Sequence, residues 1–116
     1  GSNPPDAMVV CPCTTGTLGA IANGLSDSLI ERTADVCLKE RRDLVIVPRE
    51  APLTAIALSQ MTRLAELGVV ILPPAPAFYH RPRTIEDLID FTVARILDQI
   101  GVPHQLHARW GDRDGD

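Results

Sequence analysis

The sequence predicts an α/β fold, in which helices cover both faces of a parallel β-sheet. Three short apolar runs lack the alternating pattern of half-exposed strands, as strands buried on both faces require. Helical patterns separate these runs, and this order predicts parallel strands joined by right-handed crossovers. A length of 116 residues fits a single domain.

The predicted strands cover residues 7–11, 44–47 and 69–72. Three parallel strands make a thin sheet, and the first strand begins close to the start of the chain. A doubly wound domain has more strands before this point. We therefore expect residues 1–110 to form the C-terminal part of a larger α/β domain whose N-terminal strands are missing. The polar residues 111–116 are expected to form a disordered tail.

Helical patterns predict one helix from about Leu18 and three more over residues 28–41, 54–67 and 84–100. The last pattern is the clearest, because Thr84 is a good N-cap and Gly101 suits the end of a helix. Its apolar stripe consists of Ile85, Leu88, Ile89, Thr92, Ile96 and Ile100.

Charge and composition favour a cytoplasmic protein whose main partner is neither nucleic acid nor a membrane. The chain carries 15 acidic and 11 basic residues, which gives a formal net charge of −4. No apolar run approaches the roughly 20 residues of a membrane-spanning helix, and no signal-peptide pattern is visible. The three cysteines have no framework spacing, which indicates a reducing compartment.

The segment Cys11-Pro-Cys-Thr-Thr-Gly-Thr17 joins the first strand to a helix. Hydroxyl groups and free backbone N–H groups at a helix N-terminus form an anion site, and open α/β sheets bind ligands at the carboxyl ends of strands. The alternative is an N-capping turn that binds nothing. Cys11 and Cys13 lack partners at metal-ligand spacing, so we expect buried thiols and no metal site.

A second group of charged residues flanks the middle strand. The run Lys39-Glu-Arg-Arg42 ends the preceding helix, where cations suit the helix dipole. Arg49 and Glu50 follow the strand at its carboxyl end, where the sites of this fold class lie. Their alternative interpretation is a surface ion pair of little energetic value. Whether Lys39 and Arg49 converge on one anion is a geometric hypothesis.

The loop 73–82 leaves the third strand at the same edge of the sheet. Its four prolines make it stiff, and it presents Tyr79 and His80 as one wall of a ligand site or as part of a rigid connector. Arg95 lies at the edge of the last helix's apolar stripe, where it either extends to water or meets an anion. His104 and His107 fit a solvated tail better than a metal site.

Four motifs together resemble the UbiX flavin prenyltransferases, a family also known as phenylacrylic acid decarboxylases. The resemblance runs from about residue 1 to Trp110 without an obvious gap, and the motifs recur in order with similar spacing. They read Pro12-Cys-Thr-x-x-Thr17, Lys39-Glu-Arg-Arg-x-Leu-Val45, Arg49-Glu-x-Pro-Leu53 and Phe78-Tyr-His-Arg-Pro82.

The resemblance implies a Rossmann-like flavoprotein fold and a metal-independent enzyme. Such enzymes join the dimethylallyl group of dimethylallyl monophosphate to reduced FMN, first at N5 and then at C6. The prenylated FMN then serves UbiD-type decarboxylases. Family members form homo-oligomers, dodecamers built from trimers, with active sites at subunit interfaces. The family's first strand and its flavin loop rich in glycine and serine have no counterpart in this chain.

The resemblance also assigns residues to the flavin. Thr14, Thr15, Gly16 and Thr17 match the segment that contacts FMN, and Arg49 matches an arginine on the flavin and phosphate side. Many family members have serine where this chain has Thr14, and this change keeps the hydroxyl group.

Further residues are assigned to the prenyl donor by the same resemblance. Lys39, Tyr79 and Arg95 match residues that hold the dimethylallyl phosphate, and Trp110 matches an aromatic residue near the substrate pocket. Glu50 matches an acid that handles protons around the leaving phosphate. Lys39, Arg49 and Arg95 would stabilise the charge that develops on this phosphate as it leaves, which makes Lys39 and Arg49 catalytic residues together with Glu50.

Two other functions stay open at this point. One is a flavin-dependent decarboxylase of cysteinyl substrates, of the phosphopantothenoylcysteine or lantibiotic type, although its substrate motif rich in asparagine and methionine is absent. The other is a flavin-free fragment that acts only as an assembly module. A colourless preparation that gains no thermal stability with FMN would favour the fragment.

Overall fold

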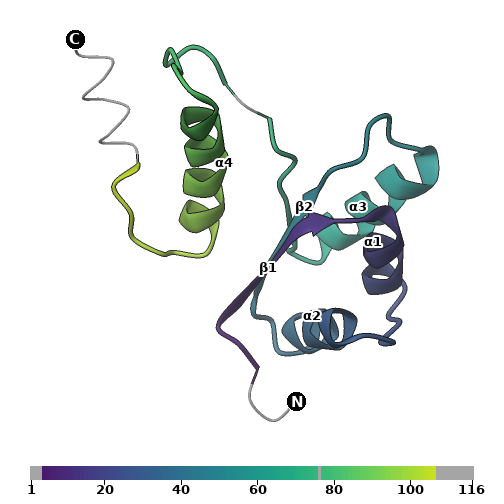
Figure 1. The fold of residues 1–116 in the computed structure, drawn as a ribbon. Helices are drawn as coiled ribbons and strands as arrows, with labels where there is room; N and C mark the ends of the chain where they lie inside the picture. The colour runs from purple at the N-terminus through teal and green to yellow at the C-terminus, as the bar shows by residue number, and fades with distance from the viewer. Residues whose placement is uncertain (1–3, 76, 107–116) are drawn as a thin grey trace. The chain divides into compact units, whose positions relative to one another are not determined.

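A computed structural model describes residues 4–75 and 77–106. The chain divides into two compact units, Gly1–Pro73 and Pro74–Asp116, which are described separately below. The first unit contains a three-stranded sheet with three helices, and the second contains one long helix with its flanking loops (Figure 1). No helix within the described ranges is long and apolar enough to cross a membrane.

The sheet of the first unit confirms the predicted α/β fold class. Its strands are parallel, lie in the order β1-β2-β3, and cover Ala7–Cys13, Asp43–Pro48 and Val70–Ile71. The first strand is two residues longer than predicted, because an irregularity between Val10 and Cys13 lets the chain rejoin β2 at Pro48. The third strand is shorter than predicted, because only Val70 and Ile71 pair with β2.

Helices α1, α2 and α3 form one layer against this sheet and cover Thr15–Ala22, Leu29–Lys39 and Ala55–Glu66. Two right-handed crossovers that advance in the same direction put their helices on the same face of a sheet. Leu44 and Ile46 of β2 accordingly belong to one hydrophobic cluster with Leu18 of α1, Cys37 of α2 and Leu64 of α3 (Figure 1).

The opposite face of the sheet is also apolar along β2. Val45 and Val47 point away from the helices because successive side chains of a strand alternate between its faces. They are nevertheless 0% and 3% exposed, which explains why the strand is a continuous apolar run in the sequence.

The helices predicted over residues 28–41 and 54–67 begin one residue later than predicted, at Leu29 and Ala55. The side chains of Ser28 and Thr54 accept hydrogen bonds from the backbone N–H three residues ahead, as N-caps do. The predicted start near Leu18 is wrong, since Thr14 caps α1 and the helix begins one residue later. Several threonines in succession can each act as a cap, so the sequence alone places this boundary poorly.

Helix α2 ends at Lys39, two residues before the predicted end. Arg41 has a left-handed backbone with φ of 56°, and the N–H of Arg42 donates to the carbonyl of Cys37 at 2.8 Å. This is the hydrogen-bond pattern of a Schellman motif, which turns the chain out of the helix and into β2.

In the second unit, α4 covers Ile85–Gln99 with Thr84 as its N-cap. Asp87 is 2% exposed; its backbone N–H donates to the hydroxyl oxygen of Thr84 and its carboxylate accepts from the N–H of Arg83, so these buried polar groups have partners. Gly101, with φ of 72°, follows the end of the helix as predicted. The predicted apolar stripe is only partly buried, since Ile85 and Ile89 are 77% and 55% exposed.

Candidate functional site at the carboxyl edge of the sheet

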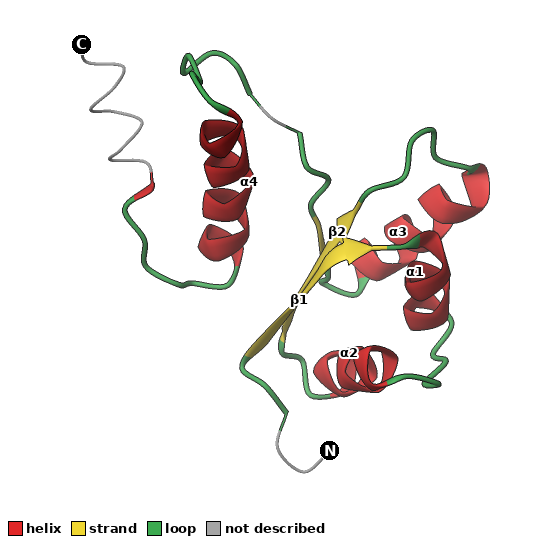
Figure 2. Cartoon of the chain, viewed as in Figure 1, coloured by secondary structure: helices red, strands yellow, loops and turns green. Residues whose placement is uncertain are grey.

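The carboxyl ends of β1 and β2 bring two of the predicted motifs together. Cys13 of β1 pairs with Pro48 of β2, and these are the last residues of the two strands. Thr14 and Arg49 are the next residues in the chain, so both motifs leave the sheet side by side. Figure 2 shows the two arrowheads at this edge, with loops leading from them toward α1 and α3.

The first turn of α1 provides the donors of an anion site. The hydroxyl oxygen of Thr14 accepts from the backbone N–H of Thr17 at 3.2 Å, and the hydroxyl group of Thr14 donates to that of Thr17 at 3.1 Å. The N–H groups of Thr15 and Gly16 have no acceptor within the helix, because the first turn of any helix lacks one. These two N–H groups are therefore available to an anion at this edge.

The charges in their first turns distinguish α1 and α3 from α2 and α4. Helices α2 and α4 carry acidic residues there, namely Glu31, Glu86 and Asp87, whereas α1 and α3 carry none. An acidic side chain in the first turn offsets the positive end of the helix dipole. In α1 and α3, which follow β1 and β2, no acidic residue of the first turn offsets the positive end of the helix dipole. This positive end can therefore attract an anion.

Thr54 belongs to the same edge and was not among the predicted site residues. It caps α3, whose N-terminus follows the loop after β2, and its hydroxyl oxygen accepts from the N–H of Ala57 at 3.1 Å. The sequence signal that could have indicated Thr54 is a threonine able to cap a helix, which follows a buried strand and precedes a first helical turn without an acidic residue.

Arg49 and Glu50 are exposed at the end of β2. The predicted alternative, an ion pair between these two side chains, is not formed, since Asp98 and His104 make the one ion pair found among the described residues. Both charges at the edge therefore stay accessible to a ligand.

Lys39 lies at the opposite edge of the sheet. It is the last residue of α2 and precedes β2, whereas Arg49 follows β2. A six-residue strand at about 3.3 Å per residue separates the two edges by roughly 17 Å. The hypothesis that Lys39 and Arg49 of one chain converge on one phosphate is therefore wrong. Lys39 instead lines a groove of about 700 Å³ that also involves Arg41, Arg42, Asp43 and Glu66.

Tyr79 and Arg95 lie in the second unit, and both are exposed. The ring of Tyr79 is nearly perpendicular to that of His80, with centroids 5.3 Å apart. His80 in turn stacks on Phe91 of α4 at 5.2 Å and 11°. Trp110, the remaining predicted substrate residue, lies outside the described residues.

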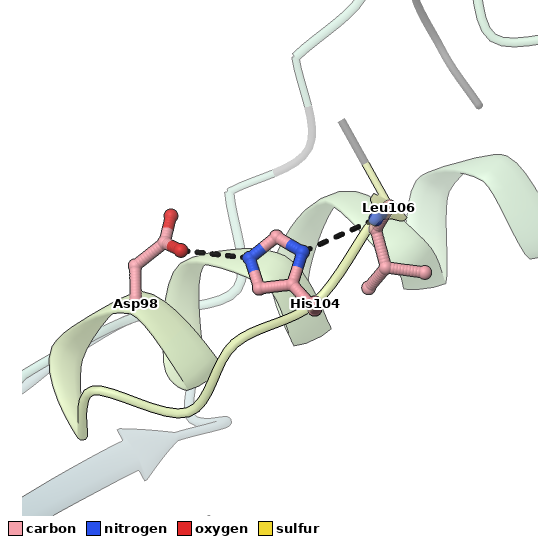
Figure 3. A network of polar contacts seen from close by, with 3 residues as sticks. All are labelled: Asp98, His104 and Leu106. Carbon is pink, nitrogen blue, oxygen red and sulfur yellow. Dashed lines mark hydrogen bonds and ion pairs between the residues drawn. The ribbon is translucent and has the colours of Figure 1, made fainter. Parts of the chain in front are cut away.

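The expected solvated tail is wrong for His104, whose side chain is 9% exposed and whose two ring nitrogens both have protein partners, as Figure 3 shows. Nε2 is 2.7 Å from a carboxylate oxygen of Asp98, and Nδ1 accepts from the backbone N–H of Leu106 at 3.1 Å. This geometry holds the segment after α4 against the helix. His107 lies outside the described residues. Across the described part of the chain, no group of three or more His, Cys, Asp or Glu residues could hold a metal ion.

The three thiols differ in exposure, and we predict that they differ in reactivity. The expectation of a buried thiol is wrong for Cys11, which is exposed, and confirmed for Cys13, which is 1% exposed; Cys37 is 0% exposed. Burial raises the pKa of Cys13 to about 11. Burial also raises the pKa of Cys37, an effect that the positive charge of Arg42 partly opposes. Because the thiolate is the reactive form, a thiol reagent at neutral pH should label Cys11 alone in the folded protein.

Quantified labelling with mass mapping checks this prediction, and rapid modification of Cys13 in the folded state would contradict it.

The raised pKa of Cys13 also has a consequence for stability. As the pH rises above 9.0, Cys13 ionises in the unfolded chain before it does so in the folded one. Folding should therefore lose stability between pH 9.0 and about 11, and Cys13→Ala should remove that part of the loss.

Gly16 allows a direct test of the anion site. A Cβ atom at this position would meet only the hydroxyl oxygen of Thr14, at 3.9 Å, so Gly16→Ala leaves the fold uncrowded. Alanine also favours the helix, by up to about 1 kcal/mol. We expect the melting temperature to stay level or rise while FMN binding weakens at least about tenfold, because the methyl group stands in front of the free N–H groups.

Gly19→Ala is the matched control, since it makes the same change one turn further along α1, against the side chain of Gln60. It should leave FMN affinity unchanged. Equal losses of FMN affinity in the two variants would mean that a change in α1 as a whole causes the loss, and not a blocked anion site at the sheet edge. Calorimetric titration with FMN and thermal melts provide both measurements.

The fold and its edge site define an α/β protein of the doubly wound class, in which ligands bind at the carboxyl ends of the strands. A family model described as Flavoprotein matches residues 2–97, and the chain belongs to this family. The Rossmann-like flavoprotein fold expected from the sequence is thereby confirmed.

Individual relatives confirm the resemblance to UbiX flavin prenyltransferases. The flavin prenyltransferase UbiX of Pseudomonas aeruginosa is 59% identical over 113 residues, which cover 97% of this chain and 54% of the relative. The chain thus spans about half the length of the curated relatives it matches.

Two solved structures share the fold. A dodecameric FMN-dependent UbiX-like decarboxylase from Escherichia coli is similar with a TM-score of 0.84 and 50% identity, over 86% of this chain and 55% of that one. A UbiX protein in complex with FMN and dimethylallyl pyrophosphate is similar with a TM-score of 0.81 and 54% identity, over 84% of this chain and 52% of that one.

Proposed function

We propose that this chain supplies the C-terminal part of a flavin prenyltransferase, which joins a dimethylallyl group from dimethylallyl monophosphate to reduced FMN. The observation that carries this proposal is the edge site. The uncompensated N-termini of α1 and α3 lie there with Arg49, in a flavoprotein similar to a UbiX protein solved in complex with FMN and dimethylallyl pyrophosphate.

The residues at the edge suit a phosphorylated flavin. In the proposed complex the N–H groups of Thr15 and Gly16 donate to FMN oxygens, and the guanidinium of Arg49 adds a charge-assisted bond. Thr14 and Thr17 hold the turn in place through their mutual hydrogen bonds. Gly16 leaves room for the ligand because it has no side chain.

The proposed reaction breaks the allylic C–O bond of dimethylallyl monophosphate, and the electron pair of that bond leaves with the phosphate. N5 of the reduced flavin forms a bond to the allylic carbon as the C–O bond breaks, and it loses its proton. The remaining double bond of the dimethylallyl group then takes up a proton, and its dimethyl-bearing carbon bonds to C6, which loses a proton in turn. Glu50 takes part in the proton transfers that accompany these steps, from its position next to Arg49. Positive side chains stabilise the phosphate as it leaves, so the reaction needs no metal ion.

Lys39, Tyr79, Arg95 and Trp110 are proposed to bind the dimethylallyl phosphate. Lys39 lies at the far edge of its own sheet, so we place it in the site of a neighbouring copy of the chain. This placement requires a homo-oligomer, in keeping with the dodecameric relative from Escherichia coli. A dodecamer built from trimers is the assembly that we propose for the intact protein.

The proposed product, prenylated FMN, has the chemistry of a cofactor rather than of an end product. We propose that a UbiD-type decarboxylase receives it, and that both proteins work in the cytoplasm.

Anaerobic incubation with reduced FMN and dimethylallyl monophosphate tests the proposed function. Mass spectrometry of the extracted flavin should show reduced FMN enlarged by one dimethylallyl unit, together with released inorganic phosphate. Flavin-loaded, folded protein that releases phosphate without an adduct, or forms neither product, would contradict the proposal. Addition of a chelator should leave the yield unchanged.

A further inference from the structure

The second unit contains an aromatic stack of Tyr79, His80 and Phe91, and the proposed reaction assigns no role to the last two residues. His80 lies between two rings, parallel to Phe91 and nearly perpendicular to Tyr79. The stack joins the loop before α4 to the helix itself, since Phe91 belongs to α4. Aromatic pairs at these centroid separations attract each other beyond the area that they bury.

The stack also relates Tyr79 to Arg95. Phe91 and Arg95 are four residues apart on α4, so their side chains lie on the same face of the helix, one turn apart. His80 holds the loop against that face through Phe91 and contacts Tyr79 directly. Tyr79 is 83% exposed even with this contact, and it lies in a turn in which the N–H of Arg81 donates to the carbonyl of Phe78 at 3.0 Å, so the ring of His80 is the aromatic contact that orients its side chain.

We propose that His80 is a positioning residue, which fixes the Tyr79 ring relative to Arg95 so that both side chains meet one phosphate group. The inference rests on the proposed function, which assigns Tyr79 and Arg95 to the dimethylallyl phosphate. In this role the imidazole acts through ring contacts and transfers no proton. A phenyl ring at the same position should therefore replace it, whereas a methyl group should not.

Nuclear magnetic resonance of the intact wild-type protein tests the stack on its own. Cross-relaxation should appear between the ring protons of His80 and those of both Tyr79 and Phe91. Absence of these contacts in the folded protein overturns the inference, whether or not the protein transfers prenyl groups.

Kinetics with dimethylallyl monophosphate as the varied substrate test the role. His80→Ala should raise KM about three- to tenfold, the range that the loss of one aromatic contact produces, with kcat within about twofold of wild type. His80→Phe should restore KM. His104→Ala, which removes an imidazole from the same unit but not from the stack, should leave KM unchanged.

Two results would overturn the positioning role. One is an unchanged KM in folded His80→Ala. The other is a raised KM that His80→Phe fails to restore, since the ring contacts would then not be the cause. A wild-type protein that shows the ring contacts but no turnover instead overturns the proposed function, and with it the assignment of Tyr79 to a phosphate.

Discussion

Glu50→Gln should lower kcat about a hundredfold or more while changing FMN affinity by less than about twofold. General acid–base groups contribute roughly 10²–10⁴ to rate, and glutamine keeps the size of the side chain but carries no transferable proton. Glu50 is exposed at the carboxyl end of β2 and makes no ion pair with other described residues, so its loss removes no structural contact there. Turnover under anaerobic conditions and FMN titration provide the two numbers.

Glu86→Gln is the matched control for this variant. Glu86 is also exposed, lies in the first turn of α4 and is assigned to no ligand, so the same charge is removed outside the proposed site. The control should keep full kcat. Equal losses of kcat and FMN affinity in Glu50→Gln would point to a structural role for Glu50 and contradict the proposed one.

Leu64→Ala should have the largest effect on stability, with a loss of about 2–5 kcal/mol in the free energy of unfolding. Leu64 is 0% exposed and belongs to the cluster between α3 and the sheet. Truncation leaves a cavity that the surrounding strands and helices fill only in part. Because domains of this size are stable by only about 5–15 kcal/mol, urea denaturation should show a much lower midpoint.

Leu58→Ala on the same helix is the control for Leu64. Leu58 is 49% exposed, so the same truncation removes much less buried surface. It should cost less than about 1 kcal/mol. Similar losses in the two variants would mean that α3 does not bury the face described above.

The fold class follows from the sequence because buried parallel strands and capped helices have strong local signals. Thr84 is the cap that its surroundings predict, and Ser28 and Thr54, the first residues of two other helical patterns, cap their helices in the structure. The start of α1 is harder to predict, since consecutive threonines are chemically equivalent candidates for its cap. Leu44 and Val45 illustrate another limit, because a continuous apolar run does not tell which side chain faces which layer.

The site is only partly predictable, because separation in sequence does not translate into separation in space. Arg49 and Thr14 are far apart in the chain but adjacent at the sheet edge, through the pairing of Cys13 with Pro48. Lys39 and Arg49 are close in the chain, yet a whole strand keeps them apart. The alternation of parallel strands and helices predicts that Thr14 and Arg49 are neighbours, because both follow strands that end at the same edge. The separation of Lys39 from Arg49 requires knowing at which edge α2 ends.

Contacts between loops and helices have no periodic signal at all. The stack of His80 on Phe91 joins a loop rich in proline to α4, and no repeat in the sequence indicates it. The left-handed turn at Arg41 is another such case, since a residue other than glycine rarely adopts it.

The most direct test of the edge site is a map of FMN binding by amide chemical-shift changes in the isotope-labelled protein. The account predicts saturable changes that are largest at the N–H groups of Thr15, Gly16 and Arg49. The largest changes around Lys39 and Arg42, at the opposite edge of the sheet, or no saturable change in the folded protein, would contradict it.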